Sequence, residues 1–301
     1  MRQLPLFLLA LLGLPACSTP SPYRYSAMVP AARPIPFDGR TAEKGTLRVE
    51  GAISKTEVDR NDFPQMHDTA VWVPRTQLEA SGAIAVSRKV ELGARFTYSS
   101  FEWARASAVG TMPFPNKPSI WGVGPEVRAT FPIDREQRFA IGIAGHFMQY
   151  RMPIARWSKT SACPTGDTCQ VDPSSGGTIY RLDEQRLEAR WTYAMGLYPT
   201  FAFGDRGRYG HLISHIGWVE GFKNDGFTDT TSSNGEVKSA GPITILGLGY
   251  GIRVKPARLG VMTFAPITSS DSPVRYLYGA FLTLGFDLDL VARDDAGEDQ
   301  R

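Results

Sequence analysis

The stretch VELGARFTYS, residues 90–99, decides the fold of this chain. Apolar or aromatic side chains occupy Val90, Leu92, Ala94, Phe96 and Tyr98, and the residues between them are polar, charged or glycine. Because successive side chains of a strand point to opposite faces, this alternation predicts a long β-strand with one apolar face. Strands of globular proteins average only about 5–6 residues.

Other stretches alternate in the same way, and the segments between them differ in length in a regular order. The expected strands cover residues 47–54, 78–86, 90–99, 121–131, 139–150, 187–203, 211–222, 243–254, 259–267 and 276–290. Short connections at 87–89, 132–138, 204–208 and 255–258 alternate with long ones at 57–74, 100–119, 151–185, 221–240 and 268–275. Tight turns at one rim and long loops at the other are typical of transmembrane β-barrels.

The last expected strand, 276–290, adds a lipid-facing pattern. We expect Tyr276, Leu282, Leu284, Phe286 and Leu288 to share one exposed apolar band. With these features the chain resembles bacterial outer-membrane β-barrel proteins over residues 47–290. The resemblance implies an all-β fold, an antiparallel up-and-down transmembrane β-barrel of about ten strands (8–12), with short periplasmic turns and long outer loops. It is a resemblance of architecture, so it carries no catalytic residues.

The N-terminus has the features of an export signal. Arg2 precedes an apolar run over residues 4–14, a length that suits a signal peptide rather than a membrane span. The following Leu14-Pro15-Ala16-Cys17 resembles the lipobox of bacterial lipoproteins. That resemblance implies that residues 1–16 are a signal peptide and that Cys17 carries acyl chains such as palmitate, which anchor the protein in a membrane. An ordinary signal peptide with an incidental Cys17 stays open as the alternative.

The domain organisation follows from these features. Residues 17–45 are rich in proline and lack apolar periodicity, which predicts an extended, mobile tether that begins at the lipidated cysteine. The barrel is expected over 46–291 and an acidic, disordered tail over 292–301. An even number of strands returns the chain to its starting side, and a lipidated Cys17 would sit in the inner leaflet. Both termini are therefore expected on the periplasmic side of the bacterial outer membrane.

Two cysteines remain after Cys17 is assigned to lipid. Cys163 and Cys169 bracket a short polar segment in the longest expected loop. Since an exported chain matures in an oxidising compartment, we expect a disulfide between them.

Charged residues on the polar face of the strands are expected to line the lumen. The predicted lumen charge network comprises Glu91, Arg95, Glu126, Arg128, Glu188, Arg190, Arg253 and Asp287. Barrels of about this size are commonly filled by side chains, and buried charges are tolerable only when they are paired. A neutralising network that fills the lumen is the expected arrangement, and a narrow selective pore is the alternative.

Several function classes have little support in the sequence. The net charge of +3 and the lack of a concentrated basic patch disfavour a nucleic-acid partner. A Gly-x-Ser-x-Gly elbow is absent, and no cofactor, metal or catalytic residue is assigned. His211 and His215 with Asp205 could form a metal site, and His67 could form part of an outer-rim site, but each pattern also arises by chance.

The sequence thus predicts a non-enzymatic outer-membrane β-barrel lipoprotein with an envelope-structural or surface-binding role. Its expected partners are outer-membrane lipid and an external ligand or protein that binds the loops. A narrow pore for small solutes, a barrel enzyme acting at the outer rim, and a soluble periplasmic barrel on a lipid tether remain alternatives.

Overall fold

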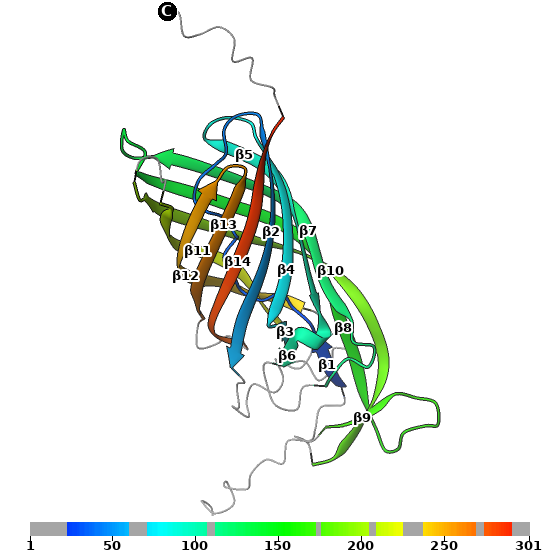
Figure 1. Ribbon diagram of the computed structural model, residues 1–301. Helices are drawn as coiled ribbons and strands as arrows, with labels where there is room; N and C mark the ends of the chain where they lie inside the picture. Colours follow the sequence, from blue (N-terminus) through cyan, green and yellow to red (C-terminus); the bar gives the residue numbers. More distant parts are fainter. Residues whose placement is uncertain are drawn as a thin grey trace, which may run out of the picture.

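Ten antiparallel strands close into a barrel in the computed structural model, which describes residues 23–59, 71–106, 112–172, 176–204, 209–224, 237–268 and 274–290 (Figure 1). The wall strands are β2 (Thr46–Asp59), β4 (Thr76–Ala85), β5 (Val90–Ser100), β7 (Ser119–Pro132), β8 (Phe139–Thr160), β10 (Thr178–Ala202), β11 (His211–Asn224), β12 (Val237–Val254), β13 (Ala257–Ile267) and β14 (Arg275–Asp289). Each pairs with its neighbour in this order, and β14 pairs with β2 to close the wall. The predicted all-β barrel is confirmed. Among the described residues no helix is long and apolar enough to cross a membrane.

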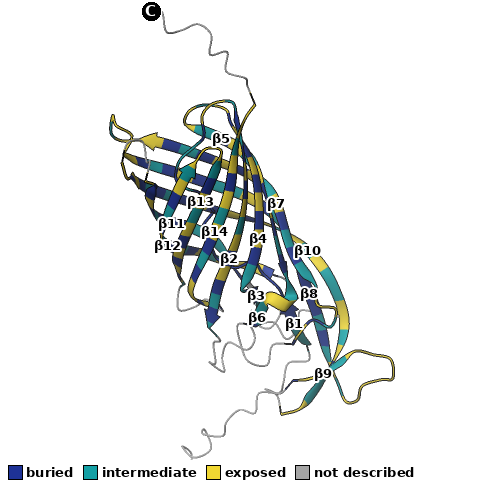
Figure 2. Cartoon of the chain, in the orientation of Figure 1, coloured by how far each residue is buried: buried dark blue, intermediate teal, exposed yellow. Residues whose placement is uncertain are grey.

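Buried and exposed residues alternate along the wall strands, so the wall has two different faces (Figure 2). In β5 the inward Glu91 and Arg95 are 0% and 2% exposed, whereas the outward Leu92 and Phe96 are 51% and 45% exposed. Large apolar side chains are similarly exposed on every wall strand. The polar residues therefore face the lumen and the apolar residues face outward, which inverts the arrangement of a soluble globular protein.

The two ends of the barrel differ as the sequence predicts. At one end, hereafter the turn end, strands are joined by the short segments 86–89, 133–138, 203–210 and 255–256. The opposite end, hereafter the loop end, carries the four longest connections, 60–75, 101–118, 161–177 and 225–236, together with the shorter 268–274. In Figure 1 the turn end is uppermost and the loop end is below.

One expected loop is mostly strand. The segment 151–185 was expected to be a long loop, but β8 and β10 stay paired as far as Thr160 and Ile179, so only 161–177 joins them. The sequence pattern does not predict this extension, because residues 152–155 are all apolar and all buried and so do not alternate with polar residues. The two strands project beyond the wall as a hairpin, on which the short β9 (Cys169–Asp172) pairs with β10.

Further short elements pack at the loop end. Strands β3 (Trp72–Pro74) and β6 (Ala104–Ala106) form a small ribbon, and the 3-10 turn η2 (Phe101–Trp103) precedes β6. The rings of Trp72 and Phe101 lie 4.8 Å apart, and those of Phe101 and Phe114 lie 5.6 Å apart. These aromatic contacts build a buried apolar cluster at the mouth of the barrel.

The N-terminal part of the described chain differs most from expectation. Residues 23–45 were assigned to a mobile tether, but β1 (Tyr23–Ala27) pairs with β8, and residues 28–45, hereafter the lumen segment, pass through the barrel and reach solvent again at residues 43 and 44. Ile35 and Phe37 are each 2% exposed. Proline-rich composition does not distinguish an extended chain in solvent from one enclosed by a wall.

The described chain also begins and ends at opposite ends of the barrel. Tyr23 pairs with Ser158, near the tip of the projecting hairpin at the loop end, whereas Leu290 lies beside Gly45 at the turn end. The two termini themselves, which were expected on one side of the membrane, lie outside the described residues. An even number of wall strands returns β14 to the start of β2, but the lumen segment adds one more passage before β2.

The expected band on β14 needs one correction. Leu282, Leu284, Phe286 and Leu288 are 43–54% exposed, as predicted, but Tyr276 is only 6% exposed. The register of β14 against β2 shifts between Tyr276 and Tyr278. A bulge of this kind changes which residues point outward, so Tyr276 turns inward and Tyr278 outward.

Candidate functional site

The lumen is the candidate site, because here the lumen segment meets charged side chains from most of the wall. At the turn end the carboxylate of Asp38 in this segment is surrounded by three arginines. Its Oδ2 accepts hydrogen bonds from Arg258 Nη1 at 2.8 Å and from Arg253 Nη2 at 3.0 Å. Arg48 Nη1 lies 3.6 Å from Oδ1. These arginines come from β13, β12 and β2, so a single residue of the segment links three wall strands.

Two wall carboxylates neutralise the remaining charge of this cluster. Arg258 Nε donates a hydrogen bond to Asp287 Oδ2 at 2.6 Å, and Arg48 Nη2 lies 3.0 Å from Glu91 Oε1. Glu91 also accepts a hydrogen bond from the backbone N–H of Ala42 in the lumen segment. Asp38, Glu91 and Asp287 thus face three arginines, and a near-balanced cluster of this kind is the arrangement in which buried charges are tolerated.

A second cluster fills the middle of the lumen. Arg95 donates hydrogen bonds to Glu126 at 2.8 and 3.0 Å and to Glu79 at 2.7 Å. Arg128 donates to the same Glu126 at 2.6 Å and lies 3.4 Å from Glu50. All five side chains are less than 10% exposed. This network ties β2, β4, β5 and β7 together across their lumen faces.

The lumen segment crosses this middle layer through backbone and aromatic contacts. Tyr198 on β10 donates a hydrogen bond from its hydroxyl to the carbonyl of Ile35 at 2.7 Å. The ring of Phe37 lies 5.2 Å from that of Tyr198 in an edge-on arrangement, and the guanidinium of Arg128 lies over Phe37 at 5.5 Å. Edge-on aromatic pairs and cations over ring faces are both favourable contacts.

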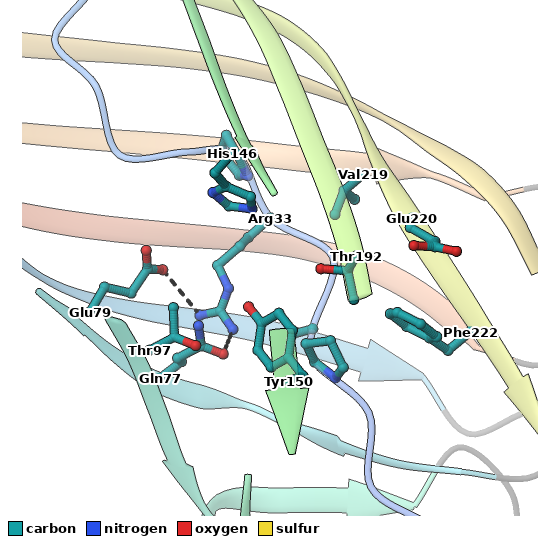
Figure 3. Close-up of a pocket in the computed structure, with 13 residues that line it drawn as sticks. Arg33, Gln77, Glu79, Thr97, His146, Tyr150, Thr192, Val219, Glu220 and Phe222 are labelled. Carbon is teal, nitrogen blue, oxygen red and sulfur yellow. Dashed lines mark hydrogen bonds and ion pairs between the residues drawn. The ribbon is translucent and has the colours of Figure 1, made fainter. Parts of the chain in front are cut away.

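Towards the loop end, Arg33 of the lumen segment contacts residues of the wall strands β2 and β4 (Figure 3). Its guanidinium hydrogen-bonds to Ser54 and Gln77 and lies 3.6 Å from Glu79. Beside it lies a cavity of about 20 Å³, lined also by His146, Tyr150 and Thr192. A cavity of that size holds about one water molecule.

The predicted network forms three groups rather than one. Arg95, Glu126 and Arg128 lie together in the middle cluster, and Glu91, Arg253 and Asp287 belong to the turn-end cluster. Glu188 and Arg190 pair with each other in β10. Their side chains are 16% and 36% exposed, so they lie outside the buried clusters.

Of the other predicted residues, the two disulfide cysteines are confirmed, and three residues lie where the structure gives no test. Cys163 and Cys169 form the predicted disulfide, with an S–S distance of 2.02 Å. His211 Nε2 lies 3.0 Å from the carbonyl oxygen of Asp38, and the ring of His215 packs on that of Tyr198 at 4.6 Å. Cys17, His67 and Asp205 lie outside the described residues.

Three charged residues of the site lie outside the strands expected from the sequence. Arg33 and Asp38 lie in the segment assigned to a tether, and Arg258 lies in an expected turn. Asp38 gave a weak signal, because this charged residue stands between Phe37 and Gly39, directly after residues 30–36, which are mostly proline and alanine. Gly39 adopts a φ of +74°, which glycine accepts without strain.

Chemically, the arrangement is suited to holding a chain in place. The charged groups of the two clusters are paired with each other or with the lumen segment. No group of His, Cys, Asp and Glu side chains suited to a metal ion occurs among the described residues.

No protein-family model and no curated protein match the chain. The N-terminal β-barrel domain of Pseudomonas aeruginosa OprF is similar at 6% identity and a TM-score of 0.31, over 82% of this chain and 100% of that one. An outer membrane channel from Pseudomonas putida F1 is similar at 10% identity and a TM-score of 0.39, over 85% and 100%. The TodX monoaromatic hydrocarbon channel, as a deletion mutant, is similar at 9% identity and a TM-score of 0.34, over 83% and 91%.

Proposed function

We propose that this chain is an outer-membrane β-barrel whose lumen is closed by its own N-terminal segment, and that it serves as a lipid-anchored platform for the structure at its loop end. The filled lumen carries this proposal. A wall that encloses a bonded chain segment and a cavity for about one water molecule does not conduct solutes while the segment stays in place.

The membrane location is supported by the outer face of the barrel. Apolar side chains such as Val127, Trp191 and Leu282 are about half exposed, at 46%, 52% and 54%. Monomeric soluble proteins rarely expose contiguous apolar surface on this scale. A closed wall also leaves no unpaired strand edge within a bilayer.

The lipid anchor is part of the same proposal. The thiol of Cys17 would take a diacylglyceryl group from a phospholipid, so that a carbon–sulfur bond forms as the carbon–oxygen bond to the phosphate headgroup breaks. The thiol proton leaves with the released headgroup. A chain carrying more than one acyl group binds membranes stably, whereas a single acyl chain binds marginally.

The platform is the projecting hairpin and the elements packed beside it. β8 and β10 are 22 and 25 residues long, about twice the 9–11 residues that a strand needs to cross a bilayer. The disulfide closes the tip of this hairpin, and β1 pairs with residues 154–158 of its β8 strand. We infer that an external ligand or protein binds at this end of the barrel.

Two measurements on the purified, detergent-solubilised protein test the proposal. An unboiled sample should migrate faster on a gel than a boiled one, as a closed barrel does. The same protein inserted into a planar lipid bilayer should show no steady conductance. Steady conductance of the unmodified protein would overturn the closed-barrel function.

A pore that opens when the lumen segment withdraws is the second candidate. One observation favours it: within the described chain, residues 30–42 belong to no strand and are held to the wall largely through side chains. If the segment is a gate, Asp38→Asn should conduct while the unmodified protein is silent. If it is a permanent plug, both proteins should be silent.

A further inference from the structure

We propose that the chain enters the barrel from the loop side, so that the residues preceding Tyr23, including Cys17, lie on the outer face of the membrane and the acyl chains of Cys17 enter the outer leaflet. This inference rests on the proposed membrane location. It reverses the side expected from the sequence for the lipid anchor.

The direction of the lumen segment follows from its contacts, which move steadily along the barrel. Near the loop end, Met28 N–H donates to Pro153 and Val29 N–H donates to Trp72, at 3.0 and 2.9 Å. Arg33 then contacts Gln77, the second residue of β4. These first partners all lie at or near the loop rim of the wall.

Later residues of the segment contact the turn end. The carbonyl of Gly39 accepts a hydrogen bond from Thr130, two residues before the end of β7. Thr41 donates to the carbonyl of Arg88 in a short turn at 3.1 Å. The N–H of Gly45 donates to the last residue of β4 at 2.9 Å. The segment therefore crosses the whole lumen once, from the loop end to the turn end.

The enclosing wall shows that this passage lies inside the barrel. Asp38 contacts β2, β12 and β13, whereas Ile35 contacts β10 and Pro36 contacts β5 through Arg95. Strands on opposite sides of the lumen thus bond to neighbouring residues of one segment. A chain lying on the outer surface could not reach inward-facing side chains of all these strands.

Chain length places Cys17 on the same side as Tyr23. Tyr23 pairs with Ser158 of β8, whereas the pairing of β7 with β8 reaches only Arg151. Tyr23 therefore lies beyond the rim of the barrel. Cys17 precedes it by six residues, which span at most about 20 Å when fully extended. The hydrocarbon core alone is about 30 Å thick, so Cys17 cannot return to the far leaflet around the outside.

The chain itself provides a clean labelling experiment. Its only three cysteines are Cys17, Cys163 and Cys169. The last two are bonded to each other, and Cys17 is blocked if it is acylated. A single added cysteine is then the sole free thiol available to a membrane-impermeant maleimide.

Three variants decide the side. Glu184→Cys marks the loop end and Glu136→Cys marks the turn end, because both residues are exposed there. Ser21→Cys marks the chain between Cys17 and Tyr23. We expect Ser21→Cys and Glu184→Cys to be labelled in intact cells, and Glu136→Cys only after the outer membrane is permeabilised. Labelling of Ser21→Cys only after permeabilisation would overturn the inference.

A cross-link tests the threading independently of the membrane. Tyr23→Cys with Ser158→Cys joins two residues that face each other across the β1–β8 pair, a spacing that a disulfide can bridge. We expect this pair to cross-link in the purified protein and the pair Tyr23→Cys with Glu136→Cys not to cross-link. Failure of the first pair overturns the threading. Cross-linking together with equal labelling of Glu184→Cys and Glu136→Cys in intact cells would instead overturn the outer-membrane location.

Discussion

The carboxylate of Asp38 lies 2.8 Å from the guanidinium of Arg258, although 220 positions separate the two residues in the chain. Asp38 belongs to the lumen segment and Arg258 to the wall strand β13, so this pair fastens the chain inside the barrel to the wall. The Asp38 side chain is 14% exposed and that of Arg258 is 7% exposed. Removing one partner of such a pair leaves an uncompensated charge in a confined space, which makes the pair a sensitive place to test the closed lumen.

Replacement of Asp38 should loosen the lumen segment. Asp38→Asn leaves Arg253, Arg258 and Arg48 without their shared carboxylate, and breaking a buried pair in this way costs about 3–5 kcal/mol. We expect faster hydrogen exchange of the amides of residues 35–45, measured by mass spectrometry in detergent micelles. The matched control is Glu43→Gln, since Glu43 pairs with Lys255 in solvent, where both side chains are more than half exposed. An exposed pair contributes at most about 1 kcal/mol, so equal effects of the two variants would contradict the role of Asp38.

Close packing of the lumen segment against β8 predicts a second effect. A Cβ atom built on Gly142 would lie 2.7 Å from the Cα of Gly39, far inside normal contact distance. Gly142→Ala should therefore displace the segment, at a cost of about 1–3 kcal/mol typical of overpacking. Gly145→Ala in the same strand is the control, because a Cβ there meets nothing closer than 3.7 Å. If both variants keep the melting temperature of the unmodified protein, the segment is not packed as described.

The wall of the barrel was predictable from sequence because its signal is local. Leu92 and Phe96 are exposed and Glu91 and Arg95 are buried, as two-residue alternation requires. The bulge that turns Tyr276 inward was not predictable, since it depends on the register of β14 against β2. Local pattern therefore defines each strand but not how two strands pair.

The lumen segment was not predictable for a related reason. The segment is buried by wall strands that lie far away in the sequence. Arg253, for example, contacts Asp38 across 215 positions. The segment has no periodicity of its own because its neighbours surround it on all sides. A chain rich in proline and small residues fits both an extended tether and an extended strap through a lumen.

The disulfide should stabilise the hairpin tip without affecting the barrel. Cys163 and Cys169 close a loop of only six positions beyond the end of β8, and chain entropy predicts at most about 2–3 kcal/mol for so short a loop. Cys163→Ser with Cys169→Ser should make residues 161–172 sensitive to a protease while the unboiled protein still migrates as a closed barrel on a gel. Loss of that fast-migrating form would show that the tip contributes to barrel assembly.

The turn at residues 133–138 should respond to acid. Backbone hydrogen bonds from Phe139 at 2.8 Å and Arg138 at 3.0 Å hold the pKa of the Asp134 carboxyl below its ordinary value of 3.8. Because the pKa in the folded state is lowered, the carboxylate stabilises the turn at neutral pH, and this contribution is lost as the pH falls through the folded-state value. The Phe139 amide shift in NMR should stay constant from pH 7 to 5 and change only in stronger acid. Asp134→Asn should remove this change, and a midpoint at or above 3.8 would contradict the arrangement.

The outer face gives the sharpest test of the membrane, because two equally exposed residues should respond differently. Leu282 is 54% exposed on β14 between Ile53 and Val261, and Ile133 is 59% exposed in a short turn. Leu282→Arg places a charge among lipid-facing side chains and should cost about 2–4 kcal/mol near the bilayer midplane. Ile133→Arg lies at the turn end, where the cost falls to about 0–1 kcal/mol. We therefore expect Leu282→Arg to lower the fraction of protein recovered as a folded barrel after refolding into lipid vesicles, and Ile133→Arg to refold normally. In water both positions would tolerate arginine alike, so equal recovery of the two variants would mean that the apolar band does not face lipid.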